Sequence, residues 1–196
     1  MRHDNVRDVE AEFLDEVCRG VETEPGLLPV DPENFEKGAI TGDMARLDIV
    51  ATGLFGNMEK TYFDVRVTHP NAPSYYEMTE ERLYALNEKE KNDDYLERCL
   101  QSEKAGFIPL VYSTTGGTGP ACEEYHKRLA LLLSSKRRDS YASVLNHIRT
   151  RVRFTVLKSI VMGIRGVRKK STKYRTTPTS LLSFELIPDM KSYECM

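Results

Sequence analysis

The first twenty residues show a helical pattern of apolar positions. Five apolar residues fall on one face at about 100° per residue, and they are Val6, Val9, Phe13, Leu14 and Val17. Asp4 or Asn5 can cap the start of such a helix, and Gly20 is placed to end it. We therefore predict an amphipathic helix over residues 5–19, followed by a possible short strand at residues 21–23.

After a loop rich in Pro, Gly and charge, alternation of apolar and polar residues predicts two adjacent strands. In residues 46–52 the alternating apolar positions are Leu47, Ile49 and Ala51. In residues 61–68 they are Phe63, Val65 and Val67. The residues between these segments include the turn formers Gly53, Gly56 and Asn57. The pattern is typical of a β-hairpin.

The second half of the chain alternates between helical and strand-like patterns. The predicted elements are, in order, a charged helix over 79–104, a short apolar strand over 107–112, and helices over 120–133 and 139–164. This order places a small mixed sheet between helices. We therefore expect one α/β (α+β) domain over residues 1–166 and a basic, flexible tail over residues 167–196.

Composition agrees with one globular domain. The chain has 196 residues, of which 30% are charged and 40% hydrophobic, as in soluble proteins. No apolar run approaches the roughly 20 residues needed to span a bilayer, and the charged start does not resemble a signal peptide. The four cysteines lack metal-ligand spacing. We expect an intracellular protein, nuclear or cytoplasmic, that is neither secreted nor membrane-bound and contains no zinc site.

Charge is unevenly distributed along the chain. The net charge is only −2, but the segment from Lys136 to Arg175 holds 13 Lys and Arg residues and one acid, Asp139. A basic end on an acidic body suggests a polyanionic partner such as nucleic acid. The alternative is a solvated helix face that runs into a basic tail.

Two aspartates in the predicted hairpin are the first candidates for chemistry. Aspartate is depleted in strands, yet Asp48 and Asp64 each lie within one of the two apolar segments. Paired strands can bring both carboxylates together, and oxygen ligands of this kind suit Mg²⁺ or Mn²⁺. The alternative is two edge positions that face water.

Two predicted helices supply further candidates. Glu10 lies inside the apolar stripe of the first helix, where a carboxylate is costly unless it is paired or near a metal; the alternative is a side chain at the edge of the stripe. Lys91 lies on one stripe of the long helix, which comprises Tyr84, Glu88, Lys91, Tyr95 and Cys99. There it can face the sheet and stabilise phosphate charge, or form a solvated pair with Glu88.

A glycine-rich segment at residues 113–119 is a weaker candidate. Its backbone N–H groups can cradle a phosphate, but it lacks the Gly-Lys-Ser/Thr ending of a P-loop. The alternative is a strand-to-helix turn. The four histidines are isolated, and none has a partner at ligand spacing.

Several segments together resemble the PD-(D/E)XK endonuclease-like domain found with reverse transcriptases of animal mobile elements. They are residues 7–12 (RDVEAE), 45–49 (ARLDI), 63–70 (FDVRVTHP), 87–91 (NEKEK) with Tyr95, 107–111 (FIPLV), 115–117 (TGG) and 125–130 (YHKRLA). The resemblance covers about four-fifths of the chain. It implies a restriction-endonuclease-like fold with the element order αβββαβ and additional C-terminal helices.

The resemblance also implies roles for individual residues. Asp48 matches the first metal-binding acid and Asp64 the second, the backbone carbonyl of Val65 would complete the coordination, and Glu10 would be the acid from the first helix. Arg66 stands where the family has lysine, and arginine is a poor base. Lys91 would then substitute for that lysine, while Arg66 would hold the nucleic-acid backbone.

Three functions follow as hypotheses. The first is a Mg²⁺- or Mn²⁺-dependent endonuclease of a retrotransposon-type mobile element, with DNA or RNA/DNA intermediates as substrate and the reverse transcriptase of the same element as partner. The second is a catalytically inactive nuclease-like module that binds nucleic acid, which the presence of Arg66 favours. The third is a decayed fragment or a protein-interaction domain.

Overall fold

The computed structural model describes residues 2–31, 35, 39–42 and 44–165. Residues 1–164 form one compact unit, and residues 165–196 form a second unit of which only Arg165 is described. The predicted basic tail over residues 167–196 therefore lies outside the described residues. Within the described residues, no helix combines the length and the apolar character that crossing a bilayer requires.

Eight main elements follow one another in the order helix, three strands, helix, strand and two helices. They are α1 (Arg2–Val17), β1 (Arg19–Thr23), β2 (Ile49–Thr52), β3 (Lys60–Thr68), α2 (Glu80–Arg98), β4 (Gly106–Ser113), α3 (Pro120–Arg137) and α4 (Tyr141–Arg165). The mixed α/β class predicted from the sequence is confirmed, and the observed order contains αβββαβ followed by two C-terminal helices. A π-helical turn, Cys99–Glu103, extends α2 toward β4.

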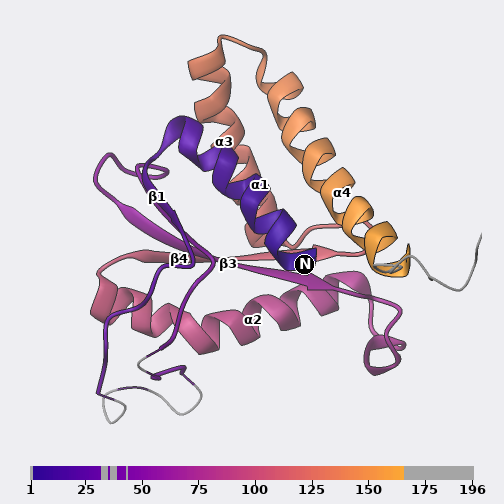
Figure 1. Cartoon of the computed structure of the whole chain (residues 1–196), viewed down its shortest axis with the longest axis horizontal. Coiled ribbons are helices and arrows are strands. Elements are labelled where there is room, and N and C mark those ends of the chain that lie inside the picture. The colour runs from indigo at the N-terminus through magenta and orange to yellow at the C-terminus, as the bar shows by residue number, and fades with distance from the viewer. Residues whose placement is uncertain (1, 32–34, 36–38, 43, 166–196) are drawn as a thin grey trace, which may run out of the picture. The chain divides into compact units, whose positions relative to one another are not determined.

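The four strands form one mixed sheet in the order β1-β2-β3-β4. The first three strands form an antiparallel meander, and β4 runs parallel to β3, with Phe107 opposite Tyr62. Parallel neighbours require a crossover connection, which α2 supplies. Figure 1 shows α2 on one face of the sheet and α1, α3 and α4 on the other. The sheet is therefore covered on both faces.

Each face of the sheet packs its own apolar cluster. On the side of α1, α3 and α4 the cluster includes Phe63, Val65 and Leu110. On the side of α2 it includes Tyr62 and Phe107. Side chains alternate along a strand, so the two clusters share β3 by taking every second residue. Asp64, between Phe63 and Val65, consequently points toward α2.

A β-bulge at Asp48 breaks the alternation that we predicted for residues 46–52. Ile49 pairs with Phe63, while the N–H group of Asp48 also donates to the Phe63 carbonyl at 3.1 Å. Two residues thus oppose one, which defines a bulge. Leu47 accordingly packs with Val50 in the cluster beside α2, whereas Ile49 packs in the other cluster. The prediction that Leu47 and Ile49 share a face was wrong, and Asp48 precedes β2 instead of lying within it.

The loop that leads into Asp48 is held by one buried arginine. Arg98, at the end of α2, is fully buried. Its guanidinium donates to the carbonyl oxygens of Leu28 at 2.7 Å, Ile40 at 2.6 Å and Gly42 at 3.2 Å. These three bonds secure both limbs of the loop against α2 and so define the approach of the chain to β2.

Candidate functional site

Asp48 is held at the end of β2 by contacts from two other elements. Its Oδ2 atom accepts a hydrogen bond from the backbone N–H group of Val65 at 2.6 Å and lies 2.8 Å from Nε2 of His3. Its side chain is 14% exposed. The bulge turns the carboxylate toward the edge of β3. Asp48 therefore bridges β3 and the first turn of α1.

Asp64 approaches the same end of β2 from the face that α2 covers. Its Oδ2 atom lies 2.8 Å from Nζ of Lys91, and the two side chains are only 8% and 19% exposed. The predicted stripe of α2 does face the sheet, since Tyr84, Tyr95 and Cys99 are buried. Lys91 therefore pairs with Asp64, and the alternative pairing with Glu88 does not occur.

The electrostatics of the site follow from burial and from these two cations. Burial raises the pKa of Asp64 above its ordinary value; the nearby charge of Asp48 adds to this effect, while Lys91 and His3 oppose it. The hydrogen bond to Asp48 is the main cause of a raised pKa for His3, with burial acting in the opposite direction. Asp64 thus senses the charge of Asp48, and the two carboxylates contact Lys91 and His3 respectively.

The donor set around these carboxylates consists of oxygen atoms. The N–H and C=O groups of a strand residue point to the same side of the strand, so the Val65 carbonyl lies on the edge of β3 where its N–H group meets Asp48. No group of three or more His, Cys, Asp or Glu side chains that could hold a metal is found among the described residues. Two carboxylates and a carbonyl nevertheless fit Mg²⁺ or Mn²⁺, which retain several water ligands.

Arg66 lies two residues beyond Asp64 and on the same side of β3. Its guanidinium forms an ion pair with Glu90 of α2 at 2.6 Å, and its side chain is 31% exposed. Arg66 is thus near the aspartates along the strand and retains access to solvent. Its placement suits contact with an anionic ligand, and its unchanging positive charge excludes a role as a base.

Glu10 points into the protein as predicted, but it belongs to a different cluster of side chains. Oε1 lies 2.9 Å from Nε2 of His126 and accepts a hydrogen bond from Tyr112 at 2.6 Å, while Oε2 accepts one from Tyr125 at 3.0 Å. All four side chains are 0–1% exposed. We call this group the Glu10 cluster. The predicted position of Glu10 beside the aspartates is therefore not observed.

Helix geometry explains this difference. His3, which contacts Asp48, and Glu10 are seven residues apart on α1, or roughly 10 Å along the helix axis.

Burial favours a raised pKa for Glu10, but His126 and the two tyrosine hydroxyls outweigh it and lower the pKa. Burial likewise opposes charge on His126, yet its contacts with Cys122 and Glu10 raise its pKa well above the ordinary value.

A glutamate side chain of α2 packs against the glycine-rich segment after β4, which the sequence made a weak candidate for phosphate binding. Glu88 of α2 accepts a hydrogen bond from the Ala121 N–H group at 3.0 Å, in the first turn of α3. A Cβ atom on Gly119 would lie 2.3 Å from Glu88 Oε1, and one on Gly117 would lie 2.1 Å from the Tyr84 hydroxyl. Because these two positions are glycines, the side chains of α2 can pack closely against the turn. The segment is therefore a strand-to-helix turn.

His3 and the capping role of Glu88 were missed at the level of sequence. Each acts on a residue far away in the chain, Asp48 and Ala121 respectively. No local spacing indicates such pairs. The one available signal was the coincidence of Glu88 with the sheet-facing stripe of α2.

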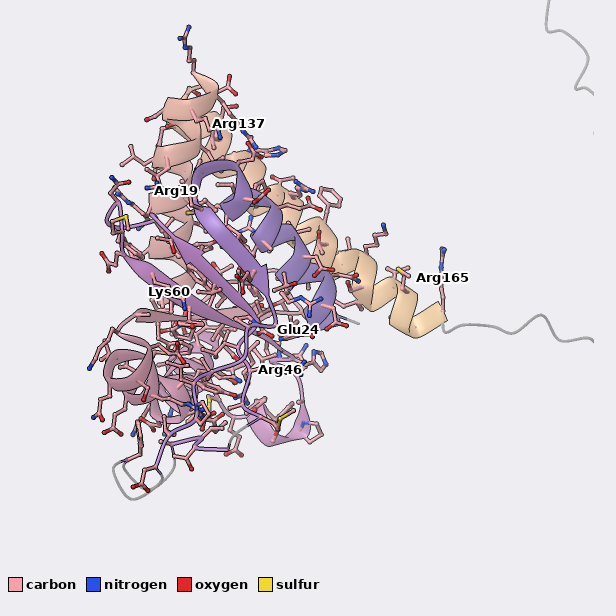
Figure 2. All side chains as sticks on the ribbon, turned by 60° about the vertical axis from the view of Figure 1, so that its left-hand side comes forward. Arg19, Glu24, Arg46, Lys60, Arg137 and Arg165 are labelled. Atoms are coloured by element: carbon pink, nitrogen blue, oxygen red, sulfur yellow. The ribbon has the colours of Figure 1, made fainter. Side chains whose placement is uncertain are left out.

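An exposed ion pair lies in the chain segments that flank Asp48. Figure 2 shows Glu24 and Arg46 near the end of β1, where their charged groups lie 4.0 Å apart and both side chains are more than half exposed. The Glu24 N–H group also donates to the Asp48 carbonyl at 2.9 Å. Three cavities lie beside α4 and the glycine-rich turn, and neither aspartate lines these three.

Comparisons of the chain with models of protein families, with curated proteins and with solved structures found no match.

Proposed function

We propose that the chain is a metal-dependent endonuclease that cleaves DNA phosphodiester bonds, as part of a retrotransposon-type mobile element. The observation that carries the proposal is the meeting of Asp48 and Asp64, two largely buried carboxylates, beside His3 and Lys91. The order αβββαβ and the resemblance of the sequence to PD-(D/E)XK endonuclease-like domains support the same assignment.

Asp48, Asp64 and the Val65 carbonyl would hold Mg²⁺ or Mn²⁺. The bound ion would lower the pKa of a water molecule and offset charge on the scissile phosphate. Glu10 has no part in this proposal, because both of its carboxylate oxygens are engaged in the Glu10 cluster.

Lys91 and Arg66 would act on the substrate. The Lys91 ammonium already lies 2.8 Å from Asp64, so it is placed to orient the attacking water and to stabilise the charge that develops on phosphorus-bound oxygen. The partly exposed Arg66 would bind a neighbouring phosphate, for which its planar guanidinium is well suited.

A polymeric substrate agrees with the charge of the surface. The 25 residues of α4 include five basic and no acidic residues, and Ser159 of α4 accepts a hydrogen bond from Asn5 of α1 at 2.8 Å. Asn5 lies two residues from His3, so the basic helix adjoins the turn that reaches Asp48. The DNA backbone would extend over α4, and RNA/DNA intermediates and the element's reverse transcriptase are proposed as further partners.

The test is cleavage of supercoiled and branched DNA in Mg²⁺, Mn²⁺ or EDTA by wild type, Asp64→Ala and the control Asp139→Ala. Asp139 is an exposed acid between α3 and α4. We expect metal-dependent nicking by wild type and by Asp139→Ala, and none by Asp64→Ala. Nicking by folded Asp64→Ala at the wild-type rate would contradict the proposal.

One observation favours a second function, that of an inactive nucleic-acid-binding module. Arg66 replaces the lysine of the resembling family, and Asp48 and Asp64 already contact His3 and Lys91 without a metal. Such a module would bind DNA in a salt-sensitive way, and binding would persist in EDTA and in Asp48→Ala. Failure to bind nucleic acid at low salt would favour a decayed fragment or a protein-interaction domain.

A further inference from the structure

His3 contacts a specific oxygen atom of the candidate site. Asp48 Oδ2 has two partners, the Val65 N–H group at 2.6 Å and His3 Nε2 at 2.8 Å. Each carboxylate oxygen offers about two lone-pair directions, so these two contacts occupy both hydrogen-bond acceptor directions of Oδ2. The other oxygen, Oδ1, is consequently the atom of Asp48 best placed to bind a ligand.

The first turn of α1 holds His3 in place. Its Nδ1 atom lies 3.2 Å from Asp4 Oδ1. Asn5 donates to Ser159 of α4 at 2.8 Å, and Val6 is fully buried in the core. The turn is thus attached both to α4 and to the core. Histidine at this position can therefore determine the orientation of the Asp48 carboxylate.

We propose that His3 is a positioning residue that, together with the Val65 N–H group, orients Asp48 so that Oδ1 faces the bound cation. The inference rests on the proposed function, because it assigns Asp48 to a metal site. It extends that function by assigning the first turn of α1 a part in the site, although as a positioning contact and not as the metal-binding acid that the resemblance implied for Glu10. Partners that orient metal-binding carboxylates commonly change metal affinity by about 10–100-fold when they are removed.

The experiment compares wild type, His3→Leu, His3→Gln and the control His69→Gln. The glutamine side chain retains an N–H donor of similar reach. Leucine fills a similar volume but has no hydrogen-bond donor. His69 is exposed and contacts Thr114. Mn²⁺ affinity is measured by electron paramagnetic resonance of the free ion. We expect affinity to fall about 10–100-fold in His3→Leu, to recover to within about threefold of wild type in His3→Gln, and to remain unchanged in His69→Gln.

A second measurement uses the metal-free protein and the amide resonance of Val65. That N–H group shares Asp48 Oδ2 with His3, so its chemical shift reports on the orientation of the carboxylate. We expect His3→Leu to move the resonance and His3→Gln to restore it. An unchanged Val65 resonance in His3→Leu, or a Mn²⁺ affinity equal to that of wild type, would overturn the inference.

The two measurements separate this inference from the proposed function. If wild type binds no Mn²⁺ but the Val65 resonance responds as expected, the metal-dependent function fails while the orientation of Asp48 by His3 is supported. If Mn²⁺ binds and depends on Asp64 but not on His3, the function stands and the positioning role is overturned. Loss of Mn²⁺ binding in both His3→Leu and His3→Gln would also overturn it, since a retained donor would then have no effect.

Discussion

Lys91 Nζ lies 2.8 Å from Asp64 Oδ2, and this ion pair connects the middle of α2 to the middle of β3. Because both side chains are largely buried, loss of the lysine would leave a carboxylate with little access to water. The same lysine is placed to act on a phosphate bound at the aspartates. Under the proposed function, the structural role of the pair can be separated from the catalytic role of Lys91.

Lys91→Met tests the catalytic role. We expect DNA cleavage to fall by at least about 100-fold, because a cation that stabilises developing charge is removed. Mn²⁺ affinity should remain at or above the wild-type value, since Asp64 loses a competing cation. Single-turnover cleavage and metal titration give the two quantities. Cleavage at the wild-type rate would exclude Lys91 from the reaction.

Glu10→Gln separates a structural role for Glu10 from the metal-binding role suggested by the sequence. We expect the free energy of unfolding to fall by about 3 kcal/mol, because a buried charged pair loses one partner. Mn²⁺ affinity of the folded protein should not change. Urea unfolding and metal titration measure the two effects. The control is Glu12→Gln, which alters an exposed ion pair with Arg151 and should cost under about 1 kcal/mol.

The pH dependence of stability tests the Glu10 cluster in a second way. The pKa of His126 is raised from 6.5, so its contribution to stability is complete below pH 6.5 and is lost as pH rises through the folded-state pKa. The pKa of Glu10 is lowered from 4.5, so its contribution is complete above pH 4.5 and is lost as pH falls through its folded-state pKa.

The measurement is urea unfolding of wild type and His126→Gln across this pH range. We expect the stability difference to be greatest between pH 4.5 and 6.5 and to shrink as pH rises toward and beyond the raised pKa of His126. A difference that does not vary with pH would show that His126 is uncharged in the folded protein.

Gly117→Ala tests the fit of α2 against the turn after β4. The new Cβ atom would lie 2.1 Å from the Tyr84 hydroxyl, so we expect a loss of about 1–3 kcal/mol in unfolding free energy. Tyr84→Phe in the same chain should recover part of that loss by removing the hydroxyl. The control is Gly163→Ala in α4. There the new Cβ atom would meet no described atom within 4 Å apart from its chain neighbours and the backbone of its own helix. A helical alanine there should stabilise the protein by up to about 1 kcal/mol.

Basic residues of α4 can be tested one at a time for contact with DNA phosphates. We expect Lys158→Gln to reduce the slope of log affinity against log salt concentration by about 0.9 for duplex DNA, as one phosphate contact is lost. Lys89→Gln, on the exposed side of α2, is the matched control and should leave the slope unchanged. Equal slopes for both variants would place the DNA elsewhere.

Elements that depend on local periodicity were predictable from the sequence. The apolar stripe of α1 gave the inward position of Glu10, and the stripe of α2 gave the sheet-facing position of Lys91. The glycines and Asn57 between residues 52 and 60 indicated the hairpin, where Gly53 has φ +110°. In each of these cases one helical or strand period relates the important residue to its apolar neighbours.

The contacts that complete the site depend on tertiary structure. A bulge adds one residue without a distinctive composition, so Asp48 was placed within the strand and not before it, and Leu47 was assigned to the wrong face. His3 meets Asp48 across 45 residues of sequence, and Glu88 meets Ala121 across 33. Sequence periodicity contains no information about such pairs, because it describes each element separately.

The way Arg98 secures the loop before β2 has a consequence for sequence variation. Arg98 binds carbonyl oxygens of Leu28, Ile40 and Gly42, and every amino acid carries that group. Substitutions in the loop can therefore accumulate while its path and the position of Asp48 persist. Loss of Arg98 would remove all three bonds at once, so natural variants should differ more often at Leu28, Ile40 and Gly42 than at this one distant residue.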